Sequence, residues 1–127
     1  MNTKVRTKIT TICETVTANF FYQYAPKGQA LPYGVYQFFA QDEEDGDTKK
    51  DHYQYWFQIT SYQRTDGLVE TLATSFETAI LAADFNTTSY RCISKKKTRR
   101  VAVPVQVGEI PKRKALITEF HLIYELL

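Results

Sequence analysis

The spacing of apolar residues predicts two amphipathic helices. Between residues 3 and 19, Val5, Ile9, Ile12 and Val16 fall three or four residues apart, which places them on one helical face. A second helix is predicted over residues 65–85, where Thr65 or Asp66 can cap the first turn. Its expected apolar stripe consists of Leu68, Val69, Leu72, Ala73, Phe76, Ile80 and Ala83.

Alternation with a period of two predicts strands in the middle of the chain. Residues 33–40 are rich in aromatic and β-branched side chains and follow the stiff dipeptide Leu31-Pro32. Residues 52–64 alternate with a period of two, with one face holding Tyr53, Tyr55, Phe57 and Ile59 and the other holding Gln54, Trp56, Gln58, Thr60 and Tyr62. The polar segment 41–51 joins these strands, so the pair is predicted to form a hairpin with a solvated tip.

The C-terminal part predicts two or three further strands, over residues 89–94, 101–107 and 115–127. Pro104 cannot donate a hydrogen bond within a ladder, so its strand is expected at an edge or a bulge. The last segment alternates Leu116, Phe120, Leu122 and Tyr124 with Glu119, His121 and Glu125, which is typical of a strand buried on one side. Residues 19–24 fit either a short strand or the close of the first helix.

This order of elements predicts an α+β fold: a mostly antiparallel sheet of about four to six strands with two helices packed on one face. We expect residues 1–127 to form a single domain, because no linker or repeat interrupts them. Strand 33–40 carries apolar groups on both faces. One face is expected beneath helix 65–85, and the other needs cover from the first helix or an adjacent subunit.

Charge is segregated along the chain, although the net charge is only +2. An acidic segment, defined as residues 42–47, holds Asp42, Glu43, Glu44, Asp45 and Asp47. A basic segment, residues 95–100, reads KKKTRR and is predicted as a loop, with Lys112, Arg113 and Lys114 at the far end of the following strand. A hairpin would bring the two basic clusters to one region.

These charges have three interpretations. The basic segment and exposed aromatics such as Trp56 and Tyr62 could bind nucleic acid through phosphates and stacking. It could instead be a solvated loop that keeps an edge strand from aggregating. Thirdly, acidic and basic protrusions on one chain could meet between neighbouring copies in a head-to-tail ring.

The sequence offers no recognisable catalytic, metal or cofactor motif. His52 and His121 belong to no motif and are expected to be surface or structural residues. The acidic segment does not have the spacing of a cation-binding loop, and the glycines form no phosphate-binding turn. Cys13 and Cys92 are interpreted as buried thiols. With neither a signal peptide nor a transmembrane stretch predicted, we expect a soluble protein made and used in a cytoplasm.

The sequence resembles the tail-terminator, or tail-completion, proteins of long-tailed bacteriophages. The resemblance is carried by "APKGQALPYGVY", in which Pro32 and Tyr33 lead into a strand, by "YQYWFQITSYQ", by the helix beginning near Gly67, and by "EFHLIYEL". The acidic segment and the basic segment are more charged than the general pattern of these proteins.

The resemblance implies an α+β fold without enzymatic activity or cofactor, in a homo-oligomeric ring, typically of six copies, within the virion tail or neck and assembled in the host bacterial cytoplasm. Such a ring ends elongation of the tail tube, contacts the tail-tube protein and offers a surface to the head connector. Loops at residues 28–32, 41–51 and 95–100 are the expected interfaces. The candidate interface or DNA-channel residues are Lys95, Lys96, Lys97, Arg99, Arg100, Asp42, Glu43, Glu44, Asp45, Pro32 and Tyr33. Basic groups in the channel would contact DNA without reading its sequence.

Two alternatives stay open. A head-tail connector or neck component shares the small size and ring-forming habit of a terminator. A small nucleic-acid-binding domain would use the basic region of residues 95–114.

Overall fold

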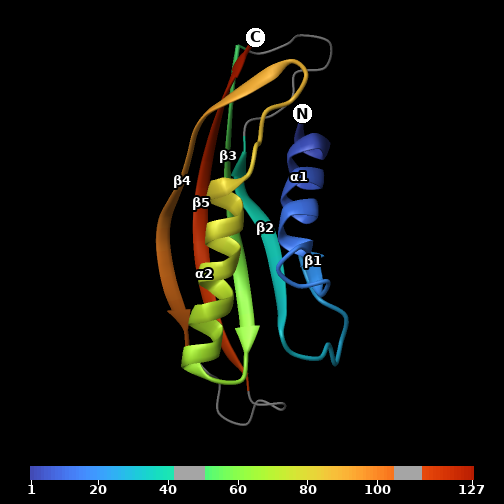
Figure 1. Ribbon diagram of the computed structural model, residues 1–127, viewed down its shortest axis with the longest axis vertical. Coiled ribbons are helices and arrows are strands. Elements are labelled where there is room, and N and C mark those ends of the chain that lie inside the picture. Colours follow the sequence, from blue (N-terminus) through green and yellow to red (C-terminus); the bar gives the residue numbers. More distant parts are fainter. Residues whose placement is uncertain (42–50, 105–112) are drawn as a thin grey trace.

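The computed structural model describes residues 1–41, 51–104 and 113–127, and it has the predicted α+β architecture (Figure 1). In chain order its elements are α1 (Asn2–Glu14), β1 (Phe20–Tyr22), β2 (Tyr33–Gln41), β3 (His52–Gln63), α2 (Asp66–Ala82), β4 (Tyr90–Val103) and β5 (Lys114–Leu126). Residues 20–22, for which two interpretations were open, form a short strand.

The five described strands form one sheet in the order β1-β2-β3-β5-β4. Strands β1 and β2 pair in parallel, whereas β2–β3, β3–β5 and β4–β5 are antiparallel. The predicted pairing of residues 33–40 with residues 52–64 is therefore confirmed. The acidic segment expected at the tip of that pair lies outside the described residues. Strand β4 occupies one edge of the sheet, as expected for the strand that leads to Pro104.

Both helices cover the same face of the sheet (Figure 1). α1 buries Val5, Ile9 and Cys13, and α2 buries Val69, Leu72, Ala73, Phe76 and Ile80. The predicted cap on α2 is Thr65, whose Oγ1 accepts a hydrogen bond from the backbone N–H of Leu68 at 3.2 Å.

Two members of the predicted stripe do not lie on the buried face of α2. Ala83 follows the helix, which ends at Ala82 and not at residue 85, and Leu68 is turned away from the sheet. Leu68 is 48% exposed, whereas Phe76 and Ile80 are fully buried. A residue four positions along a helix is rotated by about 40° from the first, so a row of four-residue steps turns away from the contact face over three steps. Ile80 lies on the face that meets the sheet, and Leu68 has turned off it.

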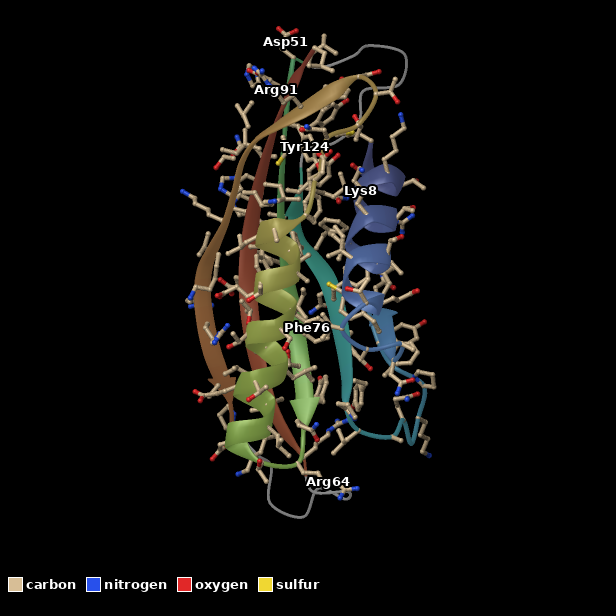
Figure 2. All side chains as sticks on the ribbon, in the orientation of Figure 1. Lys8, Asp51, Arg64, Phe76, Arg91 and Tyr124 are labelled. Carbon is tan, nitrogen blue, oxygen red and sulfur yellow. The ribbon has the colours of Figure 1, made fainter. Side chains whose placement is uncertain are left out.

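The core between helices and sheet is unusually aromatic, as the alternation in β3 and β5 predicted. Phe57 and Phe120 stack with their ring centroids 5.1 Å apart, and Tyr124 donates a hydrogen bond to the carbonyl oxygen of Phe85 at 2.9 Å. Figure 2 labels Phe76 and Tyr124, which α2 and β5 contribute to this layer. Burial also raises the pKa of the Tyr124 hydroxyl, so this donor stays protonated.

Gly34 allows β2 to approach this aromatic layer closely. A Cβ atom at this position would lie 2.7 Å from Cζ of Phe76 and 2.9 Å from Cδ1 of Phe20. Ordinary carbon contacts are about 3.5–4.0 Å, so a side chain here would overlap both rings. Because Gly34 has no Cβ, the rings of Phe20 and Phe76 can pack directly against the backbone at the start of β2.

The predicted loop at residues 95–100 is corrected by the structure, because these residues lie inside the continuous strand β4. They pair with β5 from Leu122 to Thr118, with register shifts between Cys92 and Ser94 and between Lys97 and Arg99. An edge strand tolerates such charge because one side of its backbone and much of each face are open to water. Residues 101–103 complete the same strand, and residues 105–107 lie outside the described residues.

The two cysteines are free and differ in burial. Cys13 lies on the buried face of α1 and is fully buried, and this burial strongly raises the pKa of its thiol. Cys92 is only half-buried in β4, so the expectation of two buried thiols holds for Cys13 alone.

Candidate functional site

The predicted site residues fall into separate regions of the fold. The basic segment forms the middle of edge strand β4, and Pro32 and Tyr33 lie where β2 begins. The acidic candidates Asp42, Glu43, Glu44 and Asp45 lie outside the described residues.

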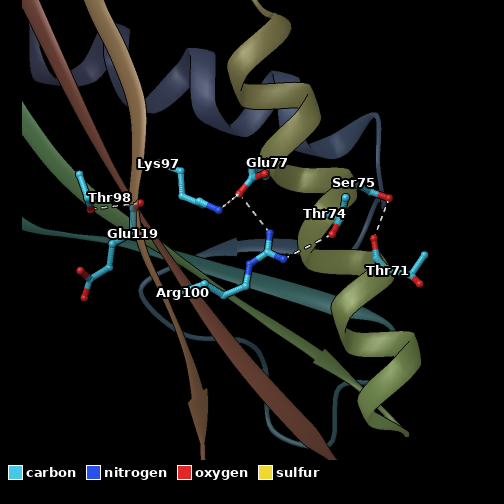
Figure 3. Close-up of polar contacts among 8 residues, drawn as sticks. All are labelled: Thr71, Thr74, Ser75, Glu77, Lys97, Thr98, Arg100 and Glu119. Carbon is cyan, nitrogen blue, oxygen red and sulfur yellow. Dashed lines mark hydrogen bonds and ion pairs between the residues drawn. The ribbon is translucent and has the colours of Figure 1, made fainter.

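Three cations of the basic segment point toward α2 or the residue that follows it. The Nζ of Lys97 lies 3.2 Å from Oε1 of Glu77, and Nη2 of Arg100 lies 3.1 Å from the same oxygen (Figure 3). Lys95 donates from Nζ to the backbone carbonyl oxygen of Ala83, directly after α2. These three residues, predicted as interface groups on a loop, therefore attach α2 to the edge of the sheet.

A β-bulge brings Lys97 and Arg100 to the same side of β4. Residues three apart on a regular strand point to opposite faces. The register skips Thr98, so that Lys97 lies opposite Phe120 and Arg100 opposite Thr118, both on the helix-covered face. One carboxylate on α2 consequently serves two cations.

Lys96 and Arg99 point to the other face of the sheet, which neither of the two described helices covers. Nη2 of Arg99 forms an ion pair with Oε1 of Glu119 at 2.8 Å and keeps a side chain that is 65% exposed. This hydrogen bond and charge raise the pKa of Arg99 above its usual value. Lys96 is exposed and lies opposite His121 in the register. The outward part of the predicted basic patch therefore consists of Lys96 and Arg99, with Arg91 farther along the strand.

The second basic cluster does not join this patch. Arg100 pairs with Thr118, and Lys114 is four residues farther along β5, about 14 Å away at the usual rise of a strand. Arg113 lies at that far end, with its guanidinium carbon 4.7 Å from the ring centroid of Tyr62. Lys112 lies outside the described residues. The prediction of one merged region is therefore wrong for the two described residues of the cluster.

The aromatics expected to be exposed are already stacked within the chain. Trp56 stacks on the ring of His121 with centroids 4.6 Å apart, and Nε2 of His121 is 3.0 Å from Oε1 of Gln54. Partial burial, and then the charge of Lys96, lower the pKa of His121. Tyr62 stacks on Tyr33 at 4.5 Å. One face of the Trp56 ring is therefore occupied by His121, and one face of the Tyr62 ring by Tyr33, so neither of these faces is available to a nucleic-acid base.

Tyr33 is only 3% exposed, because residues 23–31 fold over the uncovered face of the sheet. Between this segment and the sheet lies a pocket of about 490 Å³, whose lining includes Tyr24, Tyr33, Tyr62 and Arg113. The start of the outer face of β2, at Tyr33 and Val35, is therefore covered by a segment of its own chain and not by α1, whereas Phe39 farther along β2 is 50% exposed. Of the two predicted interface residues, Pro32 is exposed after a cis peptide bond, and Tyr33 is internal.

The described residues contain no group of three or more histidine, cysteine, aspartate or glutamate side chains placed to hold a metal ion. His52 lies at the start of β3 and His121 in the middle of β5, so the two imidazoles do not form one site. Within the same described ranges, no helix is long and apolar enough to span a membrane.

Comparison with solved structures finds the same fold in a chain of a virion particle. A chain in the structure of the virion of a native gene transfer agent (GTA) particle superposes with a TM-score of 0.58 and 16% sequence identity. The match covers 89% of the present chain and 84% of that chain. No protein-family model matches the sequence, and a search of curated proteins finds no match.

Proposed function

We propose that this protein is a structural component of a phage-like virion, and specifically the tail terminator. The observation that carries the proposal is the likeness of nearly the whole fold to a chain of the GTA virion. It agrees with the resemblance stated from "APKGQALPYGVY" and the strands that follow. In this role the protein caps the tail tube as a homo-oligomeric ring, typically of six copies, ends elongation and joins the tube to the head connector.

The described surface supports a binding role without requiring catalysis. Lys96 and Arg99 lie side by side on the uncovered face of β4, and Pro32 is exposed on the loop before β2. In the proposed ring, these groups contact neighbouring copies, the tail-tube protein or the connector. Outward cations that face the channel would contact passing DNA by charge alone.

A stop codon in this reading frame, in a phage or prophage that carries it, tests the proposal by electron microscopy. Unattached heads beside overlong tails are the expected result, because tube growth would lack its cap. Heads that leak and are empty of DNA would favour the alternative of a connector or neck component. Normal, joined particles would refute both structural roles.

A nucleic-acid-binding domain is the second candidate, favoured by Lys96, Arg99 and Arg91 on one face of β4. Ion pairs of Arg99 with Glu119 and of Arg91 with Glu125 reduce the charge available to phosphates. Oligonucleotide titration at several salt concentrations separates the two functions. Tight binding that weakens steeply with salt would support this candidate.

A further inference from the structure

The outer edge of β4 combines an unpaired strand backbone with an excess of positive charge. The sequence Tyr90–Val103 contains no acidic residue, and no other strand of the described residues lies beside its far edge. Lys96 is exposed, and the Lys97 side chain remains 40% exposed beside Glu77. An extended segment of opposite charge can bind along such an edge through main-chain hydrogen bonds and ion pairs.

We propose that this edge binds the acidic segment, residues 42–47, of a second copy of the chain. This inference rests on the proposed function, since it names the contact that would join copies in the ring. The two segments are similar in length and opposite in charge. Residues 42–47 hold five carboxylates in six positions. Of the five cations in residues 95–100, Lys96, Lys97 and Arg99 keep exposed side chains, although Lys97 and Arg99 also form ion pairs within the chain, and Lys95 and Arg100 are engaged with α2 and the residue that follows it.

A like strand is a poor partner for this edge. Two β4 edges that met across a two-fold axis would place their basic segments against each other, and like charges directly opposite destabilise strand pairing. The register shifts on either side of residues 94–97 also interrupt a long regular edge. An acidic partner removes the repulsion, so charge selects which segment binds.

The first residues of the acidic segment lie too close to the end of β2 along the chain to reach β4 of the same copy. β2, which ends at Gln41, is three strand positions from β4, about 14 Å at the usual strand spacing. The backbone of Glu43 is two residues beyond Gln41, so it reaches only about 7 Å. The first half of the acidic segment can therefore align with the basic segment only on another copy, and each copy gives one segment and receives one.

Inter-copy crosslinking of the full-length protein tests this contact. Unlabelled and ¹⁵N-labelled protein are mixed at millimolar concentration and treated with a zero-length carbodiimide, which joins carboxylates to lysine amines. Mass spectrometry then identifies the linked peptides. We expect links from residues 42–47 to Lys96 or Lys97 that combine one labelled and one unlabelled peptide.

Charge exchange provides the second measurement. Lys96→Glu and Glu44→Lys should each lower the summed yield of mixed-label links between residues 42–47 and residues 95–97 about 3- to 10-fold. The double variant should restore that yield, with the amine and the carboxylate exchanged between positions 96 and 44, because opposite charges again face each other. Lys4→Glu/Arg64→Glu is the matched control, since both residues are exposed and Arg64 lies at the opposite end of the molecule from Arg91 (Figure 2). Thermal unfolding confirms that each variant is folded.

Links confined to a single isotope label, or inter-copy links that avoid Lys95–Lys97, would overturn the proposal. So would a double variant no better than either single variant. The outcomes are independent of the assembly phenotype. Mixed-label links in a protein whose loss leaves virions intact would refute the terminator role alone, and overlong tails without these links would refute this contact alone.

Discussion

Substituting Gly34 by alanine should destabilise the protein by inserting a methyl group into a filled aromatic contact. The new Cβ would lie 2.7 Å from Cζ of Phe76 and 2.9 Å from both Cε2 of Phe76 and Cδ1 of Phe20. Relief of about 1 Å of overlap requires both rings or the strand to move, and overpacking of this kind costs about 1–3 kcal/mol. For a domain of 127 residues this corresponds to a decrease in Tm of about 4–11 °C.

Thermal and urea unfolding, followed by circular dichroism, measure this effect against a matched substitution. Gly67→Ala adds the same methyl group on α2, where nothing lies within 4 Å of the new Cβ, and should be neutral or stabilise by up to about 1 kcal/mol. If the rings cause the loss, Gly34→Ala should cost less in a Phe76→Leu background than in the wild type. A Gly34→Ala variant as stable as the wild type would refute the close packing of β2.

Three further substitutions test the contacts of α2 and of the uncovered sheet face. Glu77→Gln removes the carboxylate shared by two cations of β4 and should cost about 1–2 kcal/mol in urea unfolding, whereas Glu70→Gln on the exposed side of α2 should change stability by less than about 0.5 kcal/mol. Thr65→Ala removes the side-chain cap of α2 and should cost about 1 kcal/mol, with Thr65→Ser retaining most of it. His121 has a pKa lowered in the folded state, so the unfolded chain binds its proton more readily and stability should fall as the pH decreases below about 6.5. His121→Gln should flatten that part of the stability profile, and an unchanged slope would contradict the environment described for this imidazole.

Local periodicity was sufficient to predict most elements of the fold. In β3, side chains alternate between core and the uncovered face because the strand is buried on one side only, and this produces a pattern visible in the sequence. The position of the α2 cap was equally visible, because its chemistry depends on residues three positions apart, and the structure selects Thr65 from the two candidates Thr65 and Asp66. Leu68 was misplaced because a four-residue repeat follows the helix only approximately, and the extent of the sheet beneath decides which turn is covered.

The basic segment was misread because its partners are remote in sequence. In the sequence, a run of cations is typical of a solvated loop. Its ion pairs with Glu77 on α2 and Glu119 on β5 are formed only in the folded chain. The burial of Tyr33 was hidden for a similar reason, since the cover comes from a loop whose path over the sheet leaves no periodic signal. Charged and aromatic residues are visible in the sequence, but the tertiary contacts determine which of them remain available to a partner.

The bulge at Thr98 also affects how β4 can change in length over evolution. Deleting Thr98 would convert the bulge into regular pairing and leave Lys97 and Arg100 on the face of α2, with Arg99 still on the opposite face. Deleting Lys96, within the regular stretch of residues 94–97, would instead force the neighbouring residues on one side to exchange faces. The strand therefore tolerates the gain or loss of a single residue at Thr98 but not at Lys96. Related chains should differ in length at the bulge before they differ in which cations point toward α2 and which point away from it.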